Sequence, residues 1–423
     1  MKILWATPFN IKSAIATFSV EVCEELFRRG YDIHVLRIED KVSAALPERT
    51  CLVPIVPVGA GVPPDVDLAI INFGNHAPYH AGALAVAVDR PALAIFHDAE
   101  MRHYVYGMEH QHGVKLPLLA GASEIELRPD GFDLVDPASR PLLQSIAAMS
   151  CAAVVHGPHY LASVAEVCPG PVENIPLCFP DVGAPDPAPR ADGPFRITIF
   201  GVITAHKQPD RLIHAVAALQ DRFGKIEIHL AGAIEDRDRA AFSALAVQYE
   251  LSVPIFHGYL TDGDMSEVLT RSDVICCLRY PVTEGGSASL ITAMYHARPL
   301  IVSDVASYSV VPSELLEKVS YGNDPEDLSD SIARILTDLP SADQRALRAR
   351  DWARDNFSTA AYVDRLESVI ARAISFLPVA EACWGLAPTI CYPDGNIMLP
   401  ALETLGRSVD ELYMSRAVRG EGV

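Results

Sequence analysis

The sequence has no excess of positive charge. Its 54 Asp and Glu residues outnumber its 34 Lys and Arg residues, which gives a formal net charge of −20. Proteins that bind nucleic acid non-specifically usually present a basic surface, so this balance argues against nucleic acid as a partner. The balance still allows a local basic pocket for a phosphate group.

Paired cysteines and long apolar runs are absent as well. None of the nine cysteines forms a Cys-x-x-Cys motif, and the odd number in a chain of 423 residues indicates free thiols in a reducing compartment. No apolar run is long enough for a membrane span, and the run at residues 1–9 is too short for a signal peptide. We therefore expect a cytoplasmic protein. Peripheral contact with a membrane stays open, and the oligomeric state is not predicted.

What the sequence does contain is an alternation of strand-like and helix-like segments. The apolar segment at 2–9 is followed by helical spacing that ends near Gly30, and then by a second strand-like segment at 32–38. Further strands are expected at 67–73, 92–98, 151–157, 195–201, 226–232, 253–258, 273–279 and 299–304. Strand–helix–strand units of this kind form parallel sheets covered by helices.

The length and this alternation predict two α/β domains, each a doubly wound, Rossmann-like sheet. We place the first domain at residues 1–180, with a returning helix at about 355–378. A Pro- and Asp-rich linker is expected at 181–194, and the second domain at 195–354. Residues 379–423 form an extension whose role the sequence does not indicate.

One turn combines a carboxylate with flexible backbone. In "TEGGSASLITAM", Glu284 precedes Gly285 and Gly286, and Ser287 or Ser289 can cap the helix that follows. The glycines allow close approach of a ligand, and a carboxylate can accept hydrogen bonds from sugar hydroxyls. The plain alternative is a capped turn with a surface Glu. The turn follows an apolar strand, where ligands bind in open α/β sheets, and this favours the ligand interpretation.

A second strand-to-helix segment, "FGVITAHKQPDRLIHA", carries Gly201 and Lys207. The glycine permits a sharp turn whose N–H groups can approach an anion. A cation at a helix entrance opposes the helix dipole, so structure alone does not explain Lys207, whereas a bound diphosphate would. The alternative is a solvated loop lysine, and from this segment alone the two interpretations are about equally supported.

Taken in order, these segments resemble the C-terminal domain of retaining GT-B glycosyltransferases of the family-4 type. The matching stretches are "GVITAHKQPDRLIHA", "IEIHLAG", "FHGYL", "RSDVICCLRYP" and "EGGSASLITAMYHARPLIVSD". In the first half, "KSAIATFS", "NFGNHAPYH" and "IFHD" resemble signatures of the same group. The resemblance extends over roughly residues 1–370. It implies two domains that face each other across a cleft, a nucleotide-sugar donor and no catalytic metal or other cofactor.

The resemblance also implies roles for individual positions. Lys207 would contact the donor diphosphate, Glu284 the sugar hydroxyls, and His97 the sugar from the first domain. The donor site would be completed by Gly201, His206, Gly285, Gly286, Ser287 and Thr292. The acceptor side would be formed by Lys12, Ser13, Ala14, Ile15 and Asp98.

Two positions depart from the family pattern. Thr292 stands where the family has a second Glu at the ribose hydroxyls, and Val202 stands where an Arg commonly follows the loop glycine. A lost charged hydrogen bond costs on the order of 1.5–3 kcal/mol, so nucleotide affinity would be weaker or supplied by other groups. His206 could replace the missing cation only if an acidic neighbour kept it protonated.

Histidines gather in "FHDAEMRHYVYGMEHQH" without matching a zinc signature. We interpret His97 and Asp98 as the edge of the site, and the remaining three, His103, His110 and His112, as helix or loop surface. His76 and His80 flank Pro78, and a turn near the cleft and a solvated loop are equally compatible with them. Lys12 follows the first strand and could meet an anionic acceptor, whereas Arg28 and Arg29 suit a solvated helix end.

The predicted function is transfer of a sugar from a nucleotide-sugar to a hydroxyl acceptor with retention at the anomeric carbon. Polysaccharide and natural-product glycosylation both fit this prediction. The departures at Thr292 and Val202 keep open a catalytically silent relative that binds a glycan or a partner. A nucleotide-sugar epimerase of the same fold is a further alternative. The sequence names neither base, sugar nor acceptor.

Overall fold

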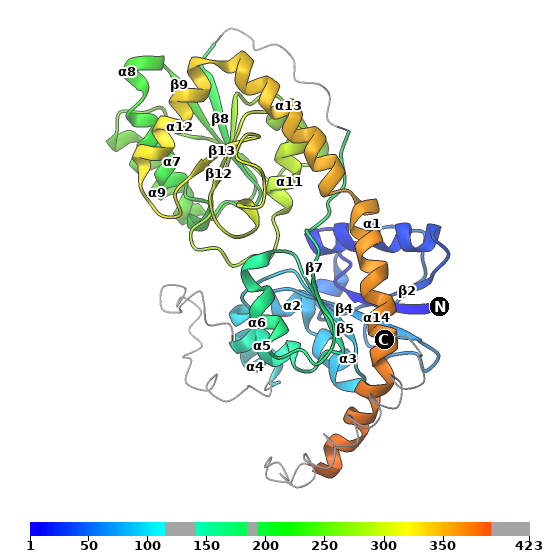
Figure 1. Cartoon of the computed structure of the whole chain (residues 1–423). Helices are drawn as coiled ribbons and strands as arrows, with labels where there is room; N and C mark the ends of the chain where they lie inside the picture. The colour runs from blue at the N-terminus through cyan, green and yellow to red at the C-terminus, as the bar shows by residue number, and fades with distance from the viewer. Residues whose placement is uncertain (115–140, 184–192, 391–423) are drawn as a thin grey trace. The chain divides into compact units, whose positions relative to one another are not determined.

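Two parallel β-sheets with helices packed against them make up the chain (Figure 1). The architecture comes from a computed structural model, and the structure describes residues 1–114, 141–183 and 193–390. Unit 1 comprises Met1–His156, Tyr160–Ile175 and the chain from Val363 onward, and unit 2 comprises Gly157–His159 and Pro176–Tyr362. Residues 184–192 of the expected linker and 391–423 of the expected extension lie outside the described residues.

Unit 1 is built on a seven-stranded sheet with the order β3-β2-β1-β4-β5-β6-β7. All of its pairings are parallel. The strands are β1 (Lys2–Thr7), β2 (Asp32–Arg37), β3 (Ile55–Val56), β4 (Leu68–Phe73), β5 (Leu93–Phe96), β6 (Ala152–Val155) and β7 (Val172–Asn174). The helices are α1 (Ala14–Arg28), α2 (Ala77–His80), α3 (Ala83–Asp89), α4 (Arg102–His112), α5 (Pro141–Ala147), α6 (Leu161–Ala165) and, from Val363 onward, α14 (Thr359–Ile390).

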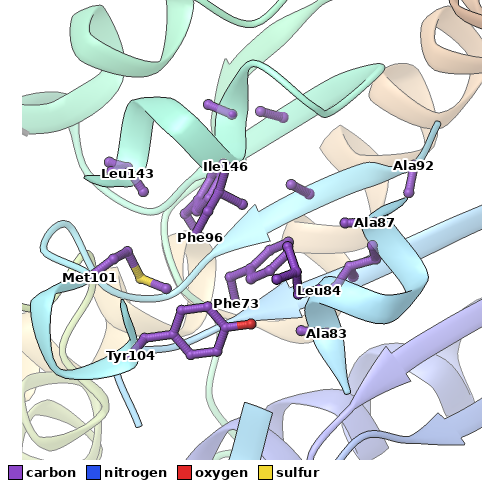
Figure 2. Packing of buried hydrophobic residues seen from close by; sticks show 14 of the residues in the cluster. Phe73, Ala83, Leu84, Ala87, Ala92, Phe96, Met101, Tyr104, Leu143 and Ile146 are labelled. Atoms are coloured by element: carbon purple, nitrogen blue, oxygen red, sulfur yellow. The ribbon is translucent and has the colours of Figure 1, made fainter. Parts of the chain in front are cut away.

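The central strands of unit 1 are buried on both faces, as expected for a parallel sheet covered by helices. Every residue of β4 and β5 is buried. On one face, Phe73 stacks on Phe96 with ring centroids 5.7 Å apart, and Tyr104 of α4 meets Phe73 edge-on at 6.3 Å (Figure 2). On the other face, the Trp5 indole donates to Ser19 of α1 over 2.9 Å. These contacts fix the helices that carry the loops at the carboxyl ends of the strands.

Unit 2 repeats the design with a six-stranded parallel sheet in the order β10-β9-β8-β11-β12-β13. Its strands are β8 (Phe195–Phe200), β9 (Ile226–Ala231), β10 (Ile255–Gly258), β11 (Val274–Cys277), β12 (Leu300–Ser303) and β13 (Glu317–Val319). Its helices are α7 (Pro209–Ala217), α8 (Gln220–Phe223), α9 (Asp236–Gln248), α10 (Asp262–Thr270), α11 (Ala288–Tyr295), α12 (Pro325–Thr337) and α13 (Leu339–Asn356). Figure 1 shows α7, α9 and α12 on one side of this sheet and α11 and α13 on the other.

The expectation of two doubly wound α/β domains is therefore confirmed. The returning helix, expected at about 355–378, is α14, and Phe357 and Ser358 separate it from α13. The eight cysteines of the described part are free thiols. Within the same part, none of the helices combines the length and apolar character needed to cross a membrane.

In both sheets the strand order reverses once, between β1 and β4 in unit 1 and between β8 and β11 in unit 2. At such a reversal the connections leave in opposite directions, and the loops at the carboxyl ends of the two strands open a crevice. We call these two places switch points.

Candidate functional site

The switch point of unit 2 brings together the segments that follow β8 and β11. The chain turns at Gly201, whose φ of +87° lies in the left-handed region that glycine readily adopts. The Gly201 amide donates to Ala231 over 2.9 Å, and the Tyr280 amide donates to the His206 carbonyl over 2.9 Å. Two segments far apart in the sequence are thus tied together by backbone hydrogen bonds.

Lys207 lies inside this switch point. It ends a short 3₁₀ turn, η5 (Ala205–Lys207), which the left-handed Gln208 terminates before α7. Its side chain folds back over the end of β8, where Nζ donates to the Phe200 carbonyl over 2.6 Å. Lys207 is only 7% exposed, so the solvated-loop interpretation is wrong. A side chain at Gly201 would lie 3.1 Å from Nζ and 3.5 Å from Ser289 Oγ, so this glycine keeps the space beside the ammonium group open.

Glu284 lies in the same cluster and is held by two hydrogen bonds to one oxygen. Arg279 Nε donates to Glu284 Oε1 over 2.7 Å, and the Tyr308 hydroxyl donates to the same oxygen over 2.7 Å. The Tyr308 oxygen also lies 2.9 Å from Ser287 Oγ. The Glu284 side chain is 18% exposed and paired, so the plain surface-Glu interpretation is wrong.

The charges in this cluster influence one another. Burial, followed by repulsion from Arg279, lowers the pKa of Lys207 to about 7, and attraction to Glu284 only partly offsets this. Burial opposes ionisation of Glu284, yet the Arg279 charge and the Tyr308 hydrogen bond bring its pKa below the ordinary value. The site therefore holds an ionised carboxylate and a lysine whose pKa lies near neutrality. Groups with strongly shifted pKa values that lie together are typical of functional sites.

The remaining donor-side residues lie around this cluster. Ser287 is the N-cap of α11 and accepts from the Leu290 amide over 3.2 Å, which leaves the glycines of the turn at the entrance of that helix. Thr292 is half-buried on α11. Val202 is 66% exposed. The His206 side chain is half-buried, and its carbonyl joins the two segments described above.

Two residues of the cluster, Arg279 and Tyr308, were not predicted from the sequence as site residues. Arg279 comes two residues after the buried strand β11, and a position just after an apolar strand is the same signal that drew attention to the glycine turn. Tyr308 belongs to η6 (Ala306–Tyr308), after β12, and is fully buried. Its 24-residue separation from Glu284 leaves no local pattern that could have indicated the contact.

The switch point of unit 1 has a different character. His97 follows β5 and is buried, with Nε2 lying 2.9 Å from Asn72 Oδ1 and Nδ1 lying 3.2 Å from His156 Nε2. The Asn72 amide group also donates to the Ala6 carbonyl over 3.1 Å. Burial, with repulsion from His156, holds the pKa of His97 well below its usual value. The network joins β1, β4, β5 and β6 through neutral hydrogen bonds.

Other predicted residues of unit 1 lie in the loops around this network. His80 is 1% exposed and its Nδ1 lies 2.9 Å from the Asn72 carbonyl, so the solvated-loop alternative is wrong for His80. Asp98 is half-buried and accepts from the Asn75 amide over 2.7 Å. The histidines of α4 differ in exposure, with His110 exposed and His103 and His112 half-buried. Among the described residues, no three His, Cys, Asp or Glu side chains gather in a way that could hold a metal ion.

The acceptor-side residues lie at the N-terminus of α1. Ser13 is buried and caps the helix by accepting from the Ala16 amide over 3.2 Å, while Lys12 and Ala14 are exposed. At the other end of α1, Arg29 pairs with Glu25, Asp364 and Glu367 at 2.7–2.9 Å. Arg29 therefore lies at a helix end, as expected, but it is half-buried and paired, so the solvated position was wrong for it.

Comparisons with known proteins agree with this architecture. Residues 185–352 match the model of a family described as glycosyl transferases group 1, and these residues lie within unit 2. No curated protein matches the chain in a sequence comparison.

Solved structures match most of the chain, at identities low enough that they show the fold alone. Sucrose-phosphate synthase from Thermosynechococcus elongatus has a TM-score of 0.64 and 15% identity, over 89% of this chain and 99% of that one. HepE of Anabaena, in complex with UDP-glucose, has a TM-score of 0.58 and 13% identity, over 88% and 99%. A glycosyltransferase from Rickettsia africae has a TM-score of 0.59 and 14% identity, over 88% and 98%. The GT-B expectation for the fold is confirmed.

Proposed function

We propose that the chain is a glycosyltransferase, because residues 185–352 match the model of the glycosyl transferases group 1 family. The donor is a nucleotide-sugar, the acceptor is a hydroxyl group, and the anomeric configuration is retained. The observation that carries the proposal is the buried Lys207, which lies beside Gly201 and Glu284 at the switch point of unit 2. That HepE was solved with UDP-glucose supports a donor of this class.

Lys207 stabilises the leaving diphosphate. Breaking the bond between the anomeric carbon and the phosphate oxygen builds negative charge on that oxygen, and a buried ammonium group is worth far more there than in water. The anion in turn raises the pKa of Lys207, so the lysine is protonated when the donor is bound. The N–H groups near Gly201 and the N-terminus of α11, behind Gly285 and Gly286, add partial positive charge to the same place.

Glu284 orients the sugar. A carboxylate accepts hydrogen bonds from sugar hydroxyls, and its value as a positioning group depends on being fixed in one orientation. Arg279 and Tyr308 both bind Oε1, so Oε2 is the oxygen that faces the sugar. The same two partners keep Glu284 ionised at neutral pH.

The acceptor hydroxyl attacks the anomeric carbon from the face that the diphosphate leaves. A carbon–oxygen bond to the acceptor forms, the bond to the phosphate oxygen breaks, and the hydroxyl proton passes to a phosphate oxygen. His97, Asp98, Lys12, Ser13 and Ala14 are the residues of unit 1 that we assign to the sugar and the acceptor.

The test is incubation of the full chain with nucleotide-sugars of uridine, guanosine, adenosine and thymidine. Released nucleoside diphosphate and the melting temperature with each diphosphate are both measured. We expect one base to shift the melting temperature and its sugar donor to release diphosphate. Magnetic resonance of the product then gives the anomeric configuration, and an inverted product would overturn retention.

Two results would favour the alternatives. A chain that releases no diphosphate and is stabilised by none of the four is a silent relative, as the departures at Thr292 and Val202 would suggest. Conversion of a donor into another nucleotide-sugar without an acceptor would instead support the epimerase.

A further inference from the structure

Arg279 is the second cation of the unit 2 switch point, and in the proposed function it only holds Glu284 in place and keeps it ionised. It lies two residues after the end of β11, and its side chain is 14% exposed. Nε donates to Glu284, and Nη1 donates to the Leu278 carbonyl over 3.2 Å. Within the described part of the chain, Nη2 makes no hydrogen bond. One end of the guanidinium is therefore available for a ligand.

The charges around Arg279 do not balance. Lys207 and Arg279 are two cations, and Glu284 is the carboxylate whose charge acts on both. The other titratable neighbours, Cys277 and Tyr308, are neutral, because burial raises the pKa of each side chain. With Lys207 protonated the cluster carries one excess positive charge, in a place where water screens it poorly.

Two adjacent buried cations are costly unless an anion accompanies them. Repulsion from Arg279 is one of the reasons that Lys207 is easily deprotonated in the empty site. A diphosphate carries enough negative charge to neutralise both cations, and a guanidinium suits phosphate oxygens because its N–H groups form a planar fork.

We propose that Arg279 binds the diphosphate of the donor directly, through the N–H groups that Glu284 and Leu278 leave unused. Arg279 thus serves two partners, Glu284 through Nε and the diphosphate through the outer edge of the guanidinium. This inference rests on the proposed function, because it assigns one more contact to the same donor. Arg279 would also supply the positive charge that is missing at Val202, an exposed apolar residue at the position where the family commonly has an Arg.

The competing explanation is that Arg279 only holds Glu284 in place for the sugar. The two explanations predict different changes in affinity for a nucleoside diphosphate that carries no sugar. If Arg279 binds the diphosphate, removing its charge weakens binding, while removing the Glu284 charge leaves binding unchanged or tightens it. If Arg279 only positions Glu284, neither substitution affects the diphosphate much, or both weaken it alike.

The experiment is titration calorimetry on the full chain. The ligands are whichever of the uridine, guanosine, adenosine and thymidine diphosphates stabilises the wild type most, and its monophosphate. The variants are Arg279→Gln, Arg279→Lys and Glu284→Gln. The matched control is Arg271→Gln, at an exposed arginine that ends α10 in the same unit.

For Arg279→Gln we expect diphosphate affinity to fall by about tenfold or more, because a charged hydrogen bond is lost. Monophosphate affinity should change by less than about threefold, since one phosphate makes fewer of these contacts. Arg279→Lys should restore part of the loss, and Glu284→Gln should bind the diphosphate at least as tightly as the wild type. The control should match the wild type.

An unchanged ratio of diphosphate to monophosphate affinity in Arg279→Gln would overturn the inference, as would equal losses in Arg279→Gln and Glu284→Gln. If Arg279→Gln does not fold, the double variant Arg279→Gln with Glu284→Gln removes both members of the ion pair and is compared with Glu284→Gln alone. If the wild type binds none of the four diphosphates, the proposed function itself is contradicted. If the wild type binds a diphosphate and Arg279→Gln binds it equally well, only the inference about Arg279 is contradicted.

Discussion

The two switch points have the same topology but opposite chemistry. In unit 2 the carboxyl ends of β8 and β11 surround Lys207, Arg279 and Glu284, and charges within this group shift the pKa values of Lys207 and Glu284. In unit 1 the corresponding strands β1 and β4 surround a neutral network centred on Asn72 and His97. The same topology thus holds ionisable side chains in unit 2 and neutral hydrogen-bonding groups in unit 1.

The largest effect is expected from the charge at the unit 2 switch point. Lys207→Met should lower kcat by about 10²–10³-fold, the loss seen when a group that stabilises transition-state charge is removed. Release of nucleoside diphosphate from the donor measures this. The matched control is Lys225→Met, at a lysine 60% exposed beside the amino end of β9, which should keep wild-type activity. Near-normal turnover of the Lys207 variant would remove the lysine from the mechanism.

The same lysine should make donor binding depend on pH. Its pKa is about 7 in the empty site, and a bound diphosphate raises it, so binding takes up a proton above neutrality. From about pH 7 to about pH 9 the affinity should therefore fall, by up to about tenfold for each pH unit. Calorimetry in buffers of different ionisation enthalpy gives the proton uptake directly. A slope that persists in Lys207→Met would assign it to another group.

Substitution in the neutral network of unit 1 should lower the stability of the fold. Asn72→Ala removes the partner of His97 Nε2 and one donor to Ala6, and a buried polar group left unpaired costs about 1–3 kcal/mol. We expect the free energy of unfolding to fall by that amount, while the affinity of nucleoside diphosphates stays unchanged. Chemical denaturation and calorimetry measure the two quantities. A change in diphosphate affinity without a change in stability would break the distinction between the two switch points.

The smallest effect is expected from removal of metal ions. The cluster in unit 2 supplies positive charge through Lys207 and Arg279, so we predict that catalysis needs no divalent cation. Activity after treatment with a chelator should equal that of the untreated enzyme. A loss that magnesium or manganese restores would show that protein cations alone do not carry the diphosphate charge.

The sequence predicted the fold and part of this comparison. The alternation of strand-like and helix-like segments indicated two doubly wound domains, and the family resemblance assigned Lys207 and Glu284 to the same donor molecule. The burial of Lys207 could not be predicted, since it depends on the η5 turn that folds the side chain over β8.

The missed contacts are those that join distant segments. Tyr308 reaches Glu284 from the loop after β12, and His156 reaches His97 across 59 residues. Neither pair leaves a spacing in the sequence, because strand order in the sheet brings them together. Arg279 was visible at a strand end, but the significance of its charge depends on its distance from the other ions. The sequence pattern can identify single residues at strand ends, whereas contacts between distant segments become visible only once the strand order is known.

The most direct test is a crystal structure of the full chain with a bound nucleoside diphosphate. We expect phosphate oxygens at about 2.7–3.2 Å from Lys207 Nζ and from the outer N–H groups of Arg279. A diphosphate bound elsewhere, with Lys207 still donating to Phe200 and Arg279 untouched, would contradict this expectation.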